Sequence, residues 1–187
     1  MANPKFIAQN LSLYTLTATS TDGSYPLTNL QDYIESTQWK SASLANTQVL
    51  KVNFGATPPE IDCIVIGNHN FASIITSVNE QLLLDYSDND SSWTNMTLWD
   101  HPNADTDPLY AAFTAGTHQY WRLSFTATGN LATYPAIGNI YLGKKLEMGS
   151  PYNFGYKDGL KGFQTSEGVA INGLIRTSQQ YGGGRKI

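Results

Sequence analysis

Apolar and polar residues alternate along much of the chain with a period of two residues, which is the spacing of a half-buried β-strand. The clearest example is Gln119–Phe125, in which Trp121, Leu123 and Phe125 alternate with polar side chains. Ile61–Ile66 is instead a short, largely apolar run, as in a strand covered on both faces. Strands are predicted around residues 11–15, 50–54, 61–66, 82–86, 93–99, 109–113, 119–125 and 137–142.

Turn signals separate these strands at short intervals, among them Asp22-Gly23, Pro58-Pro59 and Thr128-Gly129-Asn130. Helical signals are sparse. Asn29–Ser36 fits one short helix or turn. Ala72–Asn79 could form another, but its β-branched residues favour strand or irregular structure. About eight short strands without a long helix predict an all-β protein, a jelly-roll β-sandwich.

Residues 149–187 differ in kind from the rest of the chain. They hold 9 of the 16 glycines, their apolar residues are scattered, and only Gly168–Ile175 fits a strand. We therefore expect two domains, a β-sandwich over residues 1–148 and a glycine-rich, extended C-terminal arm over residues 149–187. Such a segment has little to bury by itself, so it is expected to order against a partner or a second copy; the alternative is a flexible tail without a role.

The charge is unevenly distributed along the 187 residues, whose formal net charge is -4. Residues 1–148 carry 6 basic and 13 acidic residues, whereas residues 149–187 carry 5 basic and 2 acidic ones. An acidic body of this kind argues against a nucleic-acid partner. The basic arm could dock on the acidic body of a neighbouring copy, and the alternative is an uneven, solvated surface.

The single cysteine, Cys63, excludes an intrachain disulfide, and its apolar surroundings predict a small buried side chain. No stretch of the sequence approaches the ~20 apolar residues of a membrane span, so membrane insertion is not expected. Met1–Gln9 also lacks the apolar centre of a signal peptide.

Six local patterns occur in a recognisable order: Tyr25–Leu30, Thr37–Ser41, Leu50–Gly55, Ile61–Phe71, Tyr120–Phe125 and Ile137–Gly143. This order resembles the discoidin-like, galactose-binding-type jelly roll over roughly residues 25–148. The Asn-His-Asn-Phe sequence at residues 68–71 is similar to versions found in bacteriophage tail and baseplate proteins. The resemblance implies the fold directly, and it implies a virion structural protein of the tail, tail tip or baseplate.

As a virion component, the protein would assemble in the host cytoplasm and be located in the virion. Its expected partners are other virion proteins and further copies of itself, in a homo-oligomer. The arm would join neighbours by backbone pairing and apolar anchors. The residues expected to make these contacts are Phe163, Ile171, Leu174 and Ile175.

The alternative function is a carbohydrate-binding module that recognises a cell-surface glycan. Such a site needs exposed aromatic side chains, and Trp93, Trp99 and Tyr110 are the candidates. Trp93 and Trp99 have the same strand parity, so both could instead lie in the core. Trp39 and Trp121, on framework strands, are expected to anchor the core.

Catalytic chemistry has no clear signature in the sequence. Zinc-binding spacings, a Gly-x-Ser-x-Gly elbow and a phosphate-binding glycine loop are all missing from it, and His69 is expected to bond backbone groups at a strand end. Asp85–Asp90 places carboxylates at the spacing of a calcium site but lacks the glycine and glutamate of an EF-hand loop, so a hydrated turn is expected. We predict no enzymatic activity, no catalytic residue, no metal and no cofactor.

Overall fold

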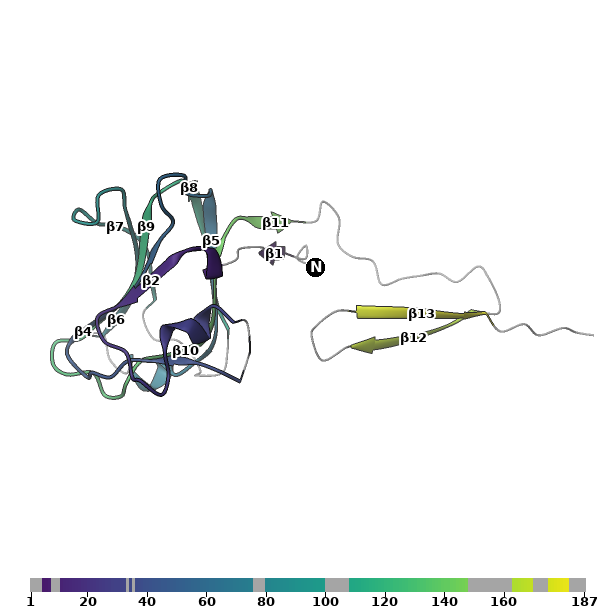
Figure 1. The fold of residues 1–187 in the computed structure, drawn as a ribbon, viewed down its shortest axis with the longest axis horizontal. Coiled ribbons are helices and arrows are strands. Elements are labelled where there is room, and N and C mark those ends of the chain that lie inside the picture. Colours follow the sequence, from purple (N-terminus) through teal and green to yellow (C-terminus); the bar gives the residue numbers. More distant parts are fainter. Residues whose placement is uncertain are drawn as a thin grey trace, which may run out of the picture. The chain divides into compact units, whose positions relative to one another are not determined.

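The computed structural model describes residues 5–7, 11–32, 34, 36–75, 80–99, 108–147, 163–169 and 175–181. The chain divides into two compact units (Figure 1). One is Pro4–Met148, which we call the body, and the other combines Met1–Asn3 with Gly149–Ile187. The helices of the described residues are short 3-10 turns, and none of them has the length and hydrophobicity that a membrane span requires.

Two antiparallel sheets form the body. The five-stranded sheet has the order β2 (Thr15–Ala18), β4 (Thr47–Asn53), β9 (Tyr120–Thr126), β6 (Gln81–Ser87) and β7 (Thr94–Trp99). The four-stranded sheet has the order β3 (Trp39–Lys40), β10 (Ala136–Gly143), β5 (Ile61–His69) and β8 (Leu109–Gly116). The predicted all-β jelly-roll sandwich is confirmed.

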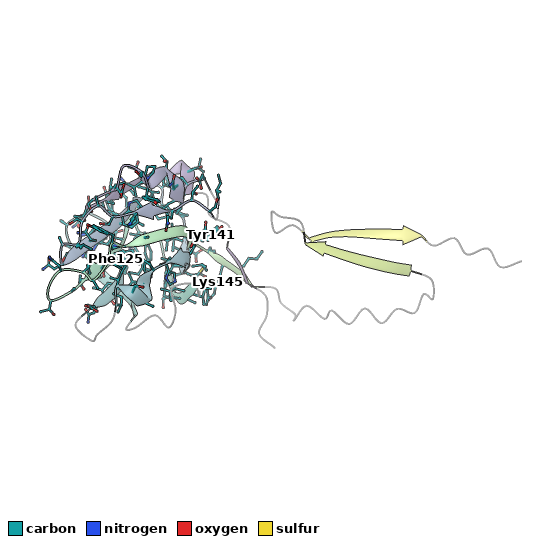
Figure 2. The ribbon with its side chains drawn as sticks, turned by 90° about the horizontal axis from the view of Figure 1, so that it is seen from below. Phe125, Tyr141 and Lys145 are labelled. Atoms are coloured by element: carbon teal, nitrogen blue, oxygen red, sulfur yellow. The ribbon has the colours of Figure 1, made fainter. Side chains whose placement is uncertain are left out.

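The core lies between the two sheets, and the period-two alternation decides which side chains enter it. Leu50 and Val52 of β4 are paired with Leu123 and Trp121 of β9, and all four side chains are buried. Phe125 follows on the same face of β9 and is also fully buried (Figure 2). Burial of each such side chain contributes about 1.5–3 kcal/mol to the free energy of folding. Core packing therefore enforces the alternation of apolar and polar residues, and the strands in this part of the chain can be predicted from it.

Trp39 and Trp121 are core anchors, as predicted, with exposed fractions of 1% and 0%. Each buried indole still satisfies its N–H group, because Trp39 Nε1 donates to Thr21 Oγ1 and Trp121 Nε1 donates to the His118 carbonyl, both at 3.2 Å. Cys63 is fully buried, also as predicted.

The strand predicted around residues 11–15 is wrong at its start. Leu11–Leu13 forms a 3-10 turn, η1, and the strand begins only at Thr15. Leu11 is fully buried whereas Leu13 is 74% exposed. Residues two apart face different sides of a 3-10 turn but the same side of a strand, so three positions of alternation cannot distinguish the two.

The helical predictions are met only by short turns. The segment predicted as Asn29–Ser36 overlaps only the end of the 3-10 turn η2, Leu27–Leu30. Near Ala72–Asn79 it has η3, Phe71–Ser73, and residues 76–79 lie outside the described part of the chain. Both turns bury one side chain in the core, Leu30 and Phe71 respectively.

A separate two-stranded ladder joins the two ends of the body, where β1 (Lys5–Ile7) pairs with β11 (Lys145–Glu147). Next to it, Lys144 Nζ donates to Glu60 Oε2 at 2.5 Å. This hydrogen bond and the charge of Glu60 raise the pKa of Lys144.

The second unit contains a hairpin of β12 (Phe163–Val169) and β13 (Ile175–Tyr181), with Phe163 opposite Tyr181 and Val169 opposite Ile175. The prediction of a single strand over Gly168–Ile175 is therefore wrong, because two strands meet there. Of the four expected assembly contacts, Phe163 and Ile175 lie on these strands, and Ile171 and Leu174 lie outside the described residues. Their role in contacting a neighbouring subunit stays a prediction.

Candidate functional site

A row of polar residues crosses the outer face of the five-stranded sheet. Its members are directly opposite one another on neighbouring strands, in the order Thr17, Lys51, Arg122, Asp85 and Asn95. They occupy the outward positions of strands whose inward positions form the core, so the alternation that builds the core also builds this row.

Hydrogen bonds fix the centre of the row. Arg122 Nε donates to Asp85 Oδ2 at 2.8 Å, and Asn95 Nδ2 donates to Asp85 Oδ1 at 3.2 Å. The Asp85 side chain is only 7% exposed, whereas that of Arg122 is 29% exposed. Because both carboxylate oxygens are engaged, Asp85 stays charge-compensated in a nearly dry position and holds the Arg122 guanidinium in place.

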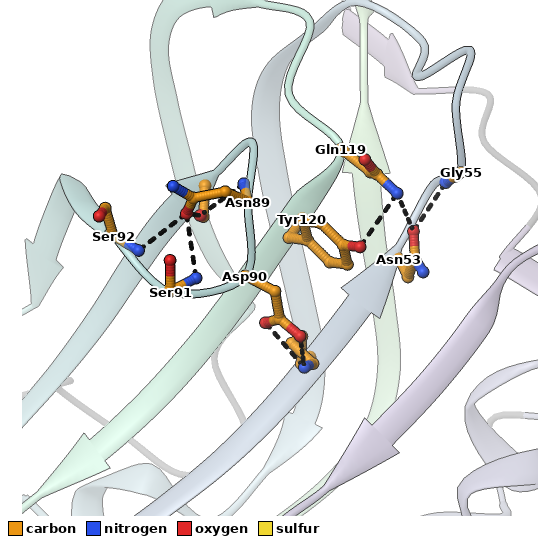
Figure 3. Close-up of polar contacts among 10 residues, drawn as sticks. Asn53, Gly55, Asn89, Asp90, Ser91, Ser92, Gln119 and Tyr120 are labelled. Atoms are coloured by element: carbon orange, nitrogen blue, oxygen red, sulfur yellow. Dashed lines mark hydrogen bonds and ion pairs between the residues drawn. The ribbon is translucent and has the colours of Figure 1, made fainter.

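The loop between β6 and β7 is folded by its own side chains (Figure 3). Asn89 Oδ1 accepts hydrogen bonds from the backbone N–H groups of Ser91 at 3.0 Å and Ser92 at 2.9 Å, and the Asn89 N–H donates to Ser87 Oγ at 3.2 Å. Asp90 has a φ angle of 57°, a left-handed conformation that aspartate tolerates better than most residues. The loop therefore turns sharply at Asp90.

This turn brings two loop side chains onto the polar row. Lys51 Nζ lies 2.8 Å and 2.6 Å from the two carboxylate oxygens of Asp90 (Figure 3). The Arg122 guanidinium carbon lies 4.1 Å from the ring centroid of Trp93, which is a cation–π contact. Sequence positions 51, 90, 93 and 122 thus meet on one surface.

These residues border a hollow of about 340 Å³ on the outer face of the sheet. We call it the sheet-face hollow. Its lining combines hydroxyl groups, charged groups and one indole: Thr17, Thr19, Lys51, Asp90, Trp93 and Arg122. It can therefore offer hydrogen-bond donors, acceptors and an aromatic surface to one ligand.

A second surface lies at one end of the four-stranded sheet, where β5 ends and β10 begins. Tyr25 and Tyr134 are 37% and 38% exposed there. Between them lies Lys40, whose Nζ is 5.6 Å from the Tyr25 ring centroid and 5.4 Å from that of Tyr134. We call these three residues the tyrosine platform.

Backbone hydrogen bonds hold the loops of the tyrosine platform together. The Lys40 N–H donates to the Tyr25 carbonyl at 3.2 Å, and the Ser41 N–H donates to the Pro135 carbonyl at 2.8 Å. The Asn70 side chain adds two further hydrogen bonds between these loops. Its Nδ2 donates to the Tyr134 carbonyl at 2.8 Å, and its Oδ1 accepts from the Ala136 N–H at 2.9 Å.

The two predicted glycan contacts whose side chains the structure describes, Trp93 and Tyr110, do not come together as one site. Trp93 lines the sheet-face hollow, whereas Tyr110, 42% exposed, lies on β8 of the other sheet. The backbone of Trp99 is opposite Leu82 on β6, and its side chain is outside the described part of the structure. The register between β6 and β7 shifts between Leu84 and Asp85, so equal parity along this segment is no guide to which residues share a face.

Sequence reasoning missed the tyrosine platform, although a signal was present. Tyr25 and Tyr134 each precede a proline, Pro26 and Pro135. Proline restricts the preceding residue to extended conformations, so a Tyr-Pro pair in a loop marks an aromatic side chain on a stiff backbone. Two such pairs in separate loops would have been a reason to expect a rigid aromatic surface.

The carboxylates of the calcium-like segment point to different partners. Asp85 bonds Arg122, Asp90 bonds Lys51, and Asp88 lies 3.0 Å from His118 Nδ1. The described residues contain no group of three or more metal-ligating side chains that could hold an ion together. His69 is buried and its Nδ1 accepts a hydrogen bond from the Phe71 backbone N–H, which is the structural role expected of it.

No family model matches the sequence, and no curated protein matches it. Several solved structures are similar to the chain. Chitosan-binding module 1 of a chitosanase/glucanase from Paenibacillus sp. IK-5 has 20% identity and a TM-score of 0.57, and the match covers 73% of this chain and 100% of the module. The CBM32-3 module of a family 31 glycoside hydrolase from Clostridium perfringens has 17% identity and a TM-score of 0.57, covering 74% and 96%.

A third similar structure is a CBM32 module of Clostridium perfringens in complex with GalNAc-β-1,3-galactose. It has 14% identity and a TM-score of 0.56, and the match covers 72% of this chain and 98% of the module. At these identities the likeness establishes the fold. The resemblance to the discoidin-like, galactose-binding-type jelly roll is confirmed to that extent.

The prediction of a bacteriophage virion structural protein is wrong. The three similar structures named above are carbohydrate-binding modules, and nothing in the comparisons indicates a tail or baseplate protein. The sequence-based argument relied on a four-residue pattern, Asn68–Phe71, and on the glycine-rich arm. In the structure Asn70 fastens a loop and His69 packs in the core, so the pattern reports on the fold and carries no information about a particle. The expected virion location depended on the same assignment.

Proposed function

We propose that the body is a non-catalytic carbohydrate-binding module that contacts its glycan at the tyrosine platform. The observation that carries this proposal is the pair of exposed tyrosines, Tyr25 and Tyr134, held on bonded loops on either side of Lys40. The modules with a similar fold support the carbohydrate-binding class, since one is named for chitosan and another is described with a bound disaccharide.

The tyrosine platform suits a sugar for a physical reason. A sugar ring has C–H groups on its faces and hydroxyl groups around its edge, so its receptor needs apolar surface next to hydrogen-bonding groups. A tyrosine supplies both, with an aromatic face and a hydroxyl group, and it loses little conformational entropy on binding. Lys40 adds N–H donors between the two rings.

Rigidity adds to the affinity that such a small surface can reach. Ordering a loop on binding costs free energy, and a receptor whose loops are already fixed avoids that cost. The backbone bonds of Lys40 and Ser41 and the two side-chain bonds of Asn70 fix the loops before a ligand arrives. The glycan therefore meets a surface that is already in its binding geometry.

Replacing a platform tyrosine tests the proposal. On a glycan array and in calorimetry with the glycans that the array identifies, Tyr134→Ala and Tyr25→Ala should each weaken binding by about tenfold, which corresponds to ~1.4 kcal/mol. Both side chains are more than a third exposed, so the unfolding midpoint in urea should change little.

Tyr110→Ala is the matched control, because Tyr110 is equally exposed but lies on β8, away from the platform. Its glycan affinity should equal that of the wild type. A folded protein that binds no glycan on the array would refute the function. If Tyr110→Ala lost binding and both platform variants kept it, the function would stand and the location would be wrong.

A further inference from the structure

We propose that the sheet-face hollow is a second binding site, separate from the tyrosine platform, and that it takes a neutral sugar unit. The inference adds a site to the proposed carbohydrate-binding function and defines the charge of its ligand. The two surfaces share no residue: the tyrosine platform belongs to loops at the end of the four-stranded sheet, and the hollow lies on the outer face of the five-stranded sheet.

The hollow offers unused hydrogen-bond donors. Arg122 uses its Nε to bond Asp85, and its guanidinium packs on Trp93. The Nη groups of Arg122 have no hydrogen-bond partner among the residues that the structure describes. A guanidinium carries five N–H donors, so a planar fork remains open toward the hollow.

Acceptors lie within the same hollow. The Asp90 carboxylate bonds Lys51, but two oxygens provide about four lone-pair sites and so can accept further hydrogen bonds. Thr17 and Thr19 add hydroxyl groups on the opposite side, along and just past β2. A sugar hydroxyl has one O–H donor and two acceptor lone pairs, so neighbouring hydroxyls can accept from the arginine and donate to the carboxylate.

Charge balance selects a neutral ligand. Lys51 and Arg122 bring two positive charges, and Asp85 and Asp90 bring two negative ones, each within an ion pair. A ligand carboxylate would bond the Arg122 fork but would also face Asp90 at short range. A neutral sugar makes the same hydrogen bonds without that repulsion.

Trp93 fixes the site before binding. Its ring stacks on the Arg122 guanidinium while Asp85 bonds the Nε, so the arginine side chain is held from two directions. The volume of about 340 Å³ is at the small end of the ~300–1,000 Å³ that ligand sites occupy, which fits one or two sugar rings. With the tyrosine platform, the body would hold a long glycan at two points and gain avidity.

The test uses matched neutral and acidic sugars, galactose and galacturonic acid, glucose and glucuronic acid, in NMR titrations of the whole chain. The indole N–H signal of Trp93, assigned with a Trp93→Phe variant, reports on the hollow. The backbone N–H signals of Lys40 and Ala136 report on the tyrosine platform. At least one neutral sugar should shift the Trp93 signal, and the matching uronic acid should bind there on the order of tenfold more weakly.

Thr17→Phe should abolish the Trp93 response by filling the hollow. Thr15→Phe is its control, since Thr15 is on the same face of β2 but does not line the hollow. If neutral sugars shift only the platform signals, or if Thr17→Phe leaves the Trp93 response intact, the hollow is not a sugar site and the proposed function stands. If only the Trp93 signal responds, the tyrosine platform is wrong and the hollow stands. A uronic acid that binds the hollow more tightly than its neutral partner would overturn the charge argument.

Discussion

The two surfaces of the body are built by different means. The tyrosine platform is held mainly by backbone hydrogen bonds between loops, whereas the sheet-face hollow is held by side-chain bonds and ion pairs on strands and one turn. Backbone bonds barely depend on salt, and they survive most substitutions. Ion pairs weaken as the salt concentration rises, and they are lost when either charged side chain is replaced. The difference predicts that the same perturbation will affect the two surfaces unequally, and that each can be damaged alone.

The largest expected effect comes from Asn70→Ala, which removes a side chain that fastens the platform loops with two hydrogen bonds. Ala136 is buried and would lose the acceptor for its N–H, and the Tyr134 carbonyl would lose a donor. The free energy of unfolding should fall by about 1–3 kcal/mol, as measured in urea, and the glycan affinity of the platform should fall with it.

Asn46→Ala is the control for this variant, because Asn46 is an exposed asparagine in the loop before β4. It should unfold like the wild type. Wild-type stability in Asn70→Ala would contradict the expected role of this side chain. It would mean that backbone hydrogen bonds alone hold the platform loops, and the contrast between the two surfaces would then be larger than described.

A smaller effect is expected from Asn89→Ala, which removes the acceptor of the Ser91 and Ser92 N–H groups. Both groups are exposed and can bond water instead, so the unfolding free energy should fall by only about 0.5–1 kcal/mol. The turn that positions Asp90 and Trp93 would loosen, however. In the NMR titration the Trp93 response to sugar should weaken while the platform signals respond as before.

Asn130→Ala, in the exposed turn at residues 128–130, is the corresponding control and should change neither surface. An equal loss at both surfaces in Asn89→Ala would indicate that they are coupled through the core, against the independence that their separate construction predicts.

The smallest effect is that of salt. Raising the ionic strength from about 0.1 M to about 1 M shortens the Debye length from ~10 Å to ~3 Å. The Lys51–Asp90 pair, with side chains 27% and 37% exposed, should weaken, and sugar binding at the hollow should decrease by a few-fold at most. Binding of a neutral sugar at the tyrosine platform should stay constant. A larger salt effect at the platform than at the hollow would contradict the comparison.

The sequence predicts the framework well where burial is strong. The alternation in β4 and β9 is enforced by core packing, so those strands and the anchors Trp39 and Trp121 follow from the pattern. It fails where a short pattern fits two structures, as at Leu11–Leu13, and where one extra residue shifts a register, as in β7. Neither feature changes the hydrophobic pattern enough to be recognised.

The candidate sites are harder to predict, because they depend on which loops meet. Trp93 could be named from sequence and a turn was expected at Asp85–Asp90, but the contact of Trp93 with Arg122 depends on the exact course of that turn, including the positive φ angle of Asp90. The tyrosine platform brings together residues 25, 40 and 134, which become neighbours only when the sheet is complete. The virion hypothesis shows an error of the opposite kind, in which too much was inferred from sequence. A local resemblance that reports only on the fold was taken as evidence of a function.

The ladder between β1 and β11 has a consequence of its own. Lys5 is opposite Glu147, so the chain enters and leaves the body at the same place. A unit with adjoining ends can be spliced into a surface loop of an unrelated host, or have its old ends joined and new ones cut elsewhere, without stretching its interior. The body is therefore portable, because its adjoining ends allow it to be carried by many architectures.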